Sequence, residues 1–163
     1  MKTNLQFFKE CFSSELGATV ALIDSAPADG LGFKPHPSNR SAGEIIEHLL
    51  CHLVDMRNLL KEVSVEETFT YAFNTPGDAS RDLRSIWEDI QGILENIDEK
   101  AWEEKESMLY IHGKLFVSLP LFRMLWFFFF DMIHHRGQLS TYIRPMGGKV
   151  PIIYGSSGDF PTF

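Results

Sequence analysis

Residues 119–144, LPLFRMLWFFFFDMIHHRGQLSTYIR, constrain the fold more than any other part of the chain. The first half of this segment is almost wholly apolar, which is typical of a helix enclosed on all sides. Its apolar run of fifteen residues, 119–133, is interrupted by Arg123 and Asp131. It is therefore shorter than the roughly 20 apolar residues that a membrane span requires. We expect a buried core helix over residues 119–144 and no membrane contact.

The second half of this segment places polar groups on one face of the predicted helix. At about 100° per residue, four polar side chains fall within roughly 60° of one another: Asp131, His135, Gln138 and Tyr142. A carboxylate and an imidazole four residues apart share a helix face and can bind one ion together. Burial of an ionised carboxylate is unfavourable unless a partner compensates it. Asp131 therefore needs a partner, and a metal ion is the most economical candidate.

Three further segments show the spacing of apolar residues that is typical of helices. They cover residues 3–24, 41–61 and 79–97. Ser41, followed by Glu44 three residues later, is a capping box that marks the start of the second helix. Pro145 disfavours helical geometry at the residue before it, so the last helix ends near Arg144.

The remaining segments are expected to connect these helices. Residues 63–77 are poorly patterned and hold at most a short turn of helix, and residues 100–118 form an ordered connector. The tail, residues 149–163, is expected to pack back through Ile152, Ile153, Tyr154 and Phe160. Four amphipathic helices joined by two longer connections predict an all-α four-helix bundle, formed as a single domain over residues 1–163.

Composition excludes several classes of protein. The net charge is −7 and no cluster of Lys and Arg is present, so an electrostatic nucleic-acid binder is not expected. The start of the chain lacks the apolar stretch of a signal peptide. Cys11 and Cys51 are too few for a disulfide framework and form no CxxC motif. These features predict a cytoplasmic protein.

The 41–61 helix supplies candidates for the other half of a metal site. His48 and His52 lie one turn apart at the border of its apolar face, so either side chain can point between helices. One of these imidazoles, together with Asp131 and His135, gives two histidines and one carboxylate. Such a set leaves coordination positions open, as catalytic metal sites do and closed structural zinc sites do not.

Other interpretations of the same residues remain open from spacing alone. A histidine at the edge of a bundle is more often a hydrogen-bonded boundary residue than a ligand. Asp131 can instead pair with Arg123, Arg136 or a histidine with no metal present, and His134 can simply face solvent.

Two segments resemble the DinB/YfiT-like superfamily. Residues 131–159, DMIHHRGQLSTYIRPMGGKVPIIYGSSGD, resemble its C-terminal signature, and RSAGEIIEHL, residues 40–49, resembles its first ligand segment. Members are four-helix bundles, often dimeric, in which one histidine and an HxxxH pair bind a divalent metal. By position, the resemblance implies His48 as the first ligand and Asp131 with His135 as the pair. Asp131 stands where the family has histidine.

The resemblance also implies a function. Nickel or zinc is the expected metal, and the oxygen ligand also admits iron or manganese. The expected activity is that of a metal-dependent enzyme, either a thiol-dependent S-transferase using a low-molecular-weight thiol and a small-molecule substrate, or a hydrolase. Four residues are candidates for orienting ligands or moving protons: His52, His134, Gln138 and Tyr142.

Two alternatives accompany this expectation. The chain can be a non-catalytic stress-response or metal-binding module, or a structural bundle with a satisfied polar cluster. In either case we expect a homodimer built from helix faces, because the chain has fourteen Phe residues and because dimers are common in the family that it resembles.

Overall fold

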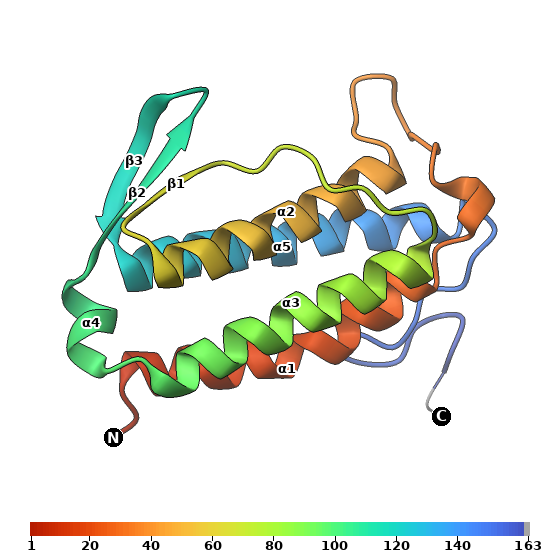
Figure 1. Ribbon diagram of the computed structural model, residues 1–163. Helices are drawn as coiled ribbons and strands as arrows, with labels where there is room; N and C mark the ends of the chain where they lie inside the picture. Colours follow the sequence, from red (N-terminus) through yellow and green to blue (C-terminus); the bar gives the residue numbers. More distant parts are fainter. Residues whose placement is uncertain (162–163) are drawn as a thin grey trace.

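The computed structural model describes residues 1–161 and consists mainly of four long helices. These are α1 (Asn4–Asp24), α2 (Ala42–Lys61), α3 (Pro76–Asn96) and α5 (Leu121–Ile143). Helices α2 and α5 form one layer and α1 and α3 form the other (Figure 1). Helix α1 packs against α3 and α5, and α2 packs against the same two helices. The bundle interior therefore has side chains from all four.

The predicted helix boundaries agree with the structure to within three residues. Helix α3 begins earlier than predicted because Thr75 caps it: the Thr75 hydroxyl accepts the Asp78 N–H, and Pro76 occupies the first turn. Helix α5 begins two residues later than predicted because residues 119 and 120 belong to a strand. None of the described helices combines the length and hydropathy that a membrane span needs.

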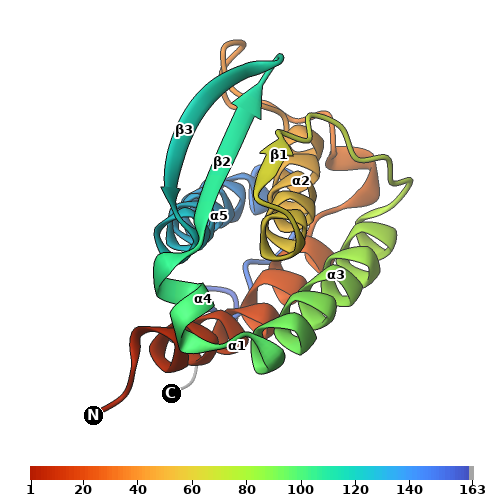
Figure 2. The same ribbon diagram turned by 60° about the vertical axis from the view of Figure 1, so that its left-hand side comes forward.

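The prediction of an all-α four-helix bundle is confirmed only in part: the structure is mainly helical, but a small sheet is added at one end of the bundle. Its strands are β1 (Ser64–Glu66), β2 (Glu106–Ile111) and β3 (Lys114–Pro120), in the order β1-β2-β3. Strands β1 and β2 are parallel, and β2 and β3 are antiparallel. The sheet lies over the ends of α2 and α5 (Figure 2).

The sheet and one short helix account for the two segments that periodicity left unassigned. Residues 63–77 contain β1 and the first two residues of α3, and the 100–118 connector contains most of α4 (Glu99–Glu104) and of the β2–β3 hairpin. The hairpin turns at His112 and Gly113, which have φ values of 50° and 71°. Two consecutive positive φ angles match the right-handed twist of the strands that they join.

Aromatic side chains dominate the core between α1, α3 and α5. Phe12 stacks on Trp87 with ring centroids 4.2 Å apart, and Phe8 lies 5.0 Å from Trp102. All four side chains are almost completely buried. Each contributes about 1.5–3 kcal/mol or more through burial of apolar surface. Phe129 of α5 joins this core with its ring centroid 5.7 Å from that of Phe12, so the core also positions α5 and the polar groups on it.

The chain leaves α5 through a tight turn. The Gly148 N–H donates to the Ile143 carbonyl at 2.9 Å, and Gly147 has a φ of 88°. In the tail that follows, Ile153 packs against the core, whereas Ile152 and Phe160 stay nearly half exposed. The last two residues of the predicted tail lie outside the described residues.

Replacement of Gly148 by alanine is expected to destabilise the protein by about 1–3 kcal/mol through steric overlap. An added Cβ would lie 2.6 Å from the Ser25 carbonyl oxygen and 2.8 Å from the Ile143 side chain. Gly155→Ala is the matched control, because nothing lies within 4 Å of its Cβ position. Urea unfolding of the three proteins measures the difference, and equal stability of both variants would contradict the close approach.

Candidate metal centre

Two helices of one layer, α2 and α5, bring four ionisable side chains together where they face each other. His48 and His52 lie on α2, one turn apart, and Asp131 and His135 lie one turn apart on α5. The start of α2 is fixed by a complete capping box, in which the Ser41 hydroxyl accepts the Glu44 N–H and the Glu44 carboxylate accepts the Ser41 N–H. The facing surfaces of α2 and α5 therefore hold the histidines opposite the carboxylate.

One oxygen of Asp131 is the centre of this cluster. The Oδ2 atom lies 2.6 Å from His52 Nε2, 3.2 Å from His135 Nε2 and 3.5 Å from His48 Nε2. The ligand atoms of His48, Asp131 and His135 all lie within 4.8 Å of one another. The structure thus brings together the three residues that the sequence indicates as ligands, and their role as ligands stays a prediction.

The distances distinguish two kinds of contact. For metal–ligand bonds of about 2.0–2.2 Å in a tetrahedral arrangement, two ligand atoms lie about 3.3–3.6 Å apart. The His135 and His48 nitrogens lie 3.2 and 3.5 Å from Asp131 Oδ2, close to that separation. The 2.6 Å contact of His52 is instead a charge-assisted hydrogen bond that orients the carboxylate.

Gln138 orients the His135 ring and selects the tautomer with the proton on Nδ1. The His135 Nδ1 atom lies 2.7 Å from the Gln138 side-chain oxygen, so Nδ1 carries a proton and donates it. The Nε2 atom of the neutral ring then has a lone pair directed toward Asp131 Oδ2. Two acceptors at this distance repel each other unless a cation lies between them. Either a second proton on His135 or a metal ion supplies the positive charge between these two atoms.

Burial and contacts set the charges of the cluster. Contact with the imidazoles of His135, His48 and His52 keeps the pKa of Asp131 well below its usual range, so this carboxylate is ionised. Burial lowers the pKa of His48 below its usual value. A neutral imidazole and an ionised carboxylate are the forms that bind metal.

The other candidate residues lie at different distances from the cluster. Tyr142 is buried one turn beyond Gln138, and its hydroxyl accepts a hydrogen bond from the Asn39 amide at 3.1 Å. His134 is exposed, with its ring 5.0 Å from that of His135. Arg123 is exposed, and Arg136 pairs with Glu15 instead of Asp131. Within residues 1–161, the ion pairs of Asp131 are made with histidines.

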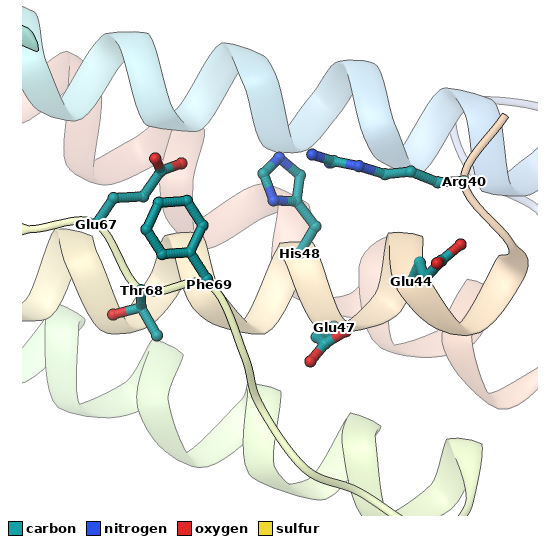
Figure 3. A pocket seen from close by; sticks show the side chains of 7 residues that line it. All are labelled: Arg40, Glu44, Glu47, His48, Glu67, Thr68 and Phe69. Atoms are coloured by element: carbon teal, nitrogen blue, oxygen red, sulfur yellow. The ribbon is translucent and has the colours of Figure 1, made fainter. Parts of the chain in front are cut away.

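A cavity of about 240 Å³ lies beside His48, and sequence reasoning missed most of its lining. Figure 3 shows Arg40 on one side of the imidazole and Glu67 and Phe69 on the other. The complete lining is Arg40, Glu44, Glu47, His48, Glu67, Thr68 and Phe69. Three of these residues follow β1 in a segment without periodicity, so no local pattern marked them.

Asp55 anchors the segment that carries Glu67 and Phe69. Its carboxylate is fully buried and accepts the Thr68 N–H at 3.1 Å and the Thr68 hydroxyl at 2.6 Å. Burial outweighs these hydrogen bonds and raises the pKa of Asp55 to about 7. The folded protein therefore retains a proton that the unfolded chain releases near pH 4.

This proton predicts a pH dependence of stability. Between about pH 4 and pH 7 the native state binds more protons than the unfolded state, so the contribution of Asp55 to the free energy of unfolding falls as the pH rises. The fall is up to about 4 kcal/mol, at 1.36 kcal/mol per pH unit. Asp55→Asn removes this pH-dependent contribution to the free energy of unfolding, so the stability of the wild type relative to the variant is expected to decrease from pH 4.5 to pH 7.5. Urea unfolding at both pH values measures it, and a constant difference would contradict the assignment.

Comparison with known proteins gives a consistent result. The family model described as the DinB family matches residues 1–161. The chain is 24% identical over 136 residues to the uncharacterized protein YjoA of Bacillus subtilis strain 168, covering 83% of this chain and 86% of that protein.

Two solved structures have the same fold. The crystal structure of the DinB-like protein YjoA from Bacillus subtilis matches with a TM-score of 0.67 and 25% identity, covering 89% of this chain and 96% of that one. A DinB-like protein from Bacillus cereus ATCC 10987 matches with a TM-score of 0.68 and 17% identity, covering 89% and 94%.

Proposed function

This chain belongs to the DinB family, and we propose on that premise that it is a divalent-metal-dependent enzyme whose metal is held by His48, Asp131 and His135. The observation that carries the proposal is the contact between His135 Nε2 and Asp131 Oδ2. With His135 Nδ1 donating to Gln138, either a proton on His135 Nε2 or a metal ion compensates the approach of these two atoms. The metal ion is the proposed solution because it also uses the His48 nitrogen, which lies 3.5 Å from the same oxygen.

The surrounding residues support the same assignment. Gln138 holds His135 through Nδ1, the ring nitrogen opposite the proposed ligand atom, which is a usual arrangement around a protein-bound metal. His52 orients Asp131 by a hydrogen bond to Oδ2, the same oxygen that faces His48 and His135. Three protein ligands leave a coordination position open. The 240 Å³ cavity reaches His48, and a smaller cavity of about 150 Å³ reaches both His48 and Asp131, so an entering molecule can approach the ligands. Nickel or zinc is the proposed metal, with iron or manganese as alternatives.

The proposed reaction is thiol-dependent group transfer or hydrolysis. A divalent ion at this site would lower the pKa of a bound thiol or water so that it acts as a nucleophile near neutral pH. The chain itself orients the ligands through Gln138 and His52, and the Glu67 carboxylate lines the cavity where it can accept a proton from an entering group.

Metal analysis followed by activity assays tests this proposal. Inductively coupled plasma mass spectrometry is expected to find about one equivalent of nickel or zinc per chain after reconstitution. Transfer of a low-molecular-weight thiol to aromatic electrophiles, or hydrolysis of activated esters, is then expected to depend on that metal. Metal binding without either activity would favour a non-catalytic metal-binding or stress-response module. If the protein binds no divalent metal, the result would favour a structural helical bundle without a metal-dependent function.

We also propose that the protein forms a homodimer through the outer face of α1 and α5. Phe7 is 53% exposed and Phe130 is 63% exposed on that face. They line an apolar groove of about 530 Å³ together with Trp126 and Phe129. Exposed apolar patches of this kind are typical of protein interfaces. Light scattering is expected to give twice the chain mass at micromolar concentration, and a monomer would contradict the proposal.

A further inference from the structure

Arg40 is a positive charge directed at the candidate metal centre without a structural role in the described part of the chain. Its guanidinium points toward the His48 ring (Figure 3), and Arg40 and His48 line the same cavity. No ion pair or side-chain hydrogen bond engages it within residues 1–161. The two nearest acids on α2 are otherwise engaged: Glu44 pairs with Lys34 at 3.0 Å and Glu47 accepts the Tyr71 N–H at 2.9 Å.

An apolar chamber lies at the opposite end of the His–Asp cluster. It has a volume of about 150 Å³, which is enough for a benzene ring. Strands β2 and β3 and helix α5 provide its apolar walls, with Leu109, Ile111, Phe116, Phe127 and Phe128. His48, His52, Glu67 and Asp131 complete the lining, so the chamber opens directly onto the candidate ligands.

Arg40 and the apolar chamber lie at two different positions along α5. A third cavity is lined by Arg40, His135, Gln138 and Tyr142, which places Arg40 beside the C-terminal half of α5, whereas the chamber lies beside Phe127 and Phe128. Ten residues separate Phe128 from Gln138, which is about 15 Å at 1.5 Å per residue. Asp131 and His135 lie between these two positions.

We propose that the substrate of this site is an elongated molecule with an anionic oxygen group at one end and an apolar group at the other. Its carboxylate or phosphate contacts Arg40, its apolar end fills the chamber, and its reactive bond lies between them at His48, Asp131 and His135. Arginine is suited to this recognition because its planar guanidinium donates two parallel hydrogen bonds to such groups. This inference rests on the proposed metal-dependent activity.

Binding of three probes that share a phenyl group and a six-carbon chain tests the charge requirement: 6-phenylhexanoate, 6-phenylhexyl phosphate and neutral 6-phenyl-1-hexanol. Isothermal titration calorimetry on the nickel-loaded protein is expected to show at least one anion binding about ten- to a hundredfold more tightly than the alcohol. The stronger of the two anions identifies the carboxylate or the phosphate. Equal affinity for all three probes would overturn the proposal.

Matched variants locate the two ends of the site. Arg40→Gln is expected to remove the preference for the anion, and Arg84→Gln, an exposed arginine on α3, is expected to keep it. Phe127→Ala is expected to lower the affinity for all three probes several-fold. Phe130 is an exposed aromatic residue on α5 that lines the apolar groove between α1 and α5, so Phe130→Ala is expected to leave the three affinities unchanged. Unchanged anion binding in Arg40→Gln would overturn the assignment of Arg40.

Failure of this inference can be told apart from failure of the metal proposal. Arg40 is not among the proposed ligands, so Arg40→Gln is expected to bind nickel as the wild type does. If the wild type binds no divalent metal, the metal proposal fails. The affinities of the anions and of the alcohol can still be compared on the metal-free protein. If the wild type prefers an anion and Arg40→Gln does not, Arg40 recognises the anion.

Discussion

Asp131→Asn is expected to lower the affinity for nickel or zinc by about a hundredfold or more, while the bundle stays folded. Changes to residues that only support metal ligands already cost about 10–100-fold. Asp131 provides the oxygen around which all three histidines gather, and its contacts with them keep it ionised. An amide oxygen carries no charge and is a weaker ligand. Titration of both proteins against a competing chelator measures the two affinities.

Thermal melting gives an independent measurement of the same variant. A ligand that binds the folded state stabilises it, so added metal is expected to raise the melting temperature of the wild type and to have little effect on Asp131→Asn. Asp89→Asn, an exposed change of equal charge on α3, is expected to keep the full metal-induced shift. Asp131→His, which gives the three-histidine set that the resemblance implies, is expected to retain binding. Equal shifts in wild type and Asp131→Asn would exclude Asp131 as a ligand.

The long helices were predictable because periodicity and capping are local properties of a sequence. The Ser41–Glu44 capping box was recognised, and α2 begins within one residue of the predicted position. Thr75 and Asp78 form the equivalent signal at the start of α3, whereas the apolar spacing alone predicts a start three residues later. In both helices, therefore, the capping residues at the boundary determine where the helix starts.

The sheet could not be predicted in the same way because its pairing is not local. Strand β1 has three residues, and it pairs with β2 more than forty positions away, with Val65 opposite Leu109. The hairpin turns at His112 and Gly113, and a non-glycine residue with positive φ gives a weaker signal than an Asn-Gly pair. The connector therefore appeared to lack regular structure.

The candidate site shows the same division between local and distant information. Asp131 and His135 are four residues apart on one helix, so their shared face followed from helix geometry alone. The choice between His48 and His52 depends on the rotation of α2 against α5, which packing of the whole bundle determines. Arg40, Glu67 and Phe116 come from loops and a strand, and only the three-dimensional structure brings them to the cluster.

A second large effect is expected far from the candidate metal centre, at the ion pair between Glu15 and Arg136. Arg136 on α5 is 3% exposed, and its guanidinium lies 2.5 Å from the Glu15 carboxylate on α1. It also donates to the Thr19 hydroxyl at 3.1 Å and to the Tyr154 hydroxyl, which in turn donates to Glu15 at 3.0 Å. This network links α1, α5 and the tail.

Glu15→Gln is expected to lower the free energy of unfolding by about 3–5 kcal/mol, because it leaves a buried guanidinium without its counter-charge. The exposed pair of Lys2 and Glu10 provides the control, and Glu10→Gln is expected to cost at most about 1 kcal/mol. Urea unfolding measures all of these variants.

The double variant Glu15→Gln with Arg136→Met separates the cost of an unpaired charge from the loss of contacts. Removing both charges eliminates the uncompensated guanidinium, and methionine still fills much of the buried volume. The double variant is therefore expected to recover most of the stability that Glu15→Gln loses. If it is instead less stable than Glu15→Gln, the guanidinium contributes mainly through its hydrogen bonds to Thr19 and Tyr154 and its position over the Tyr154 ring, 5.2 Å from the centroid.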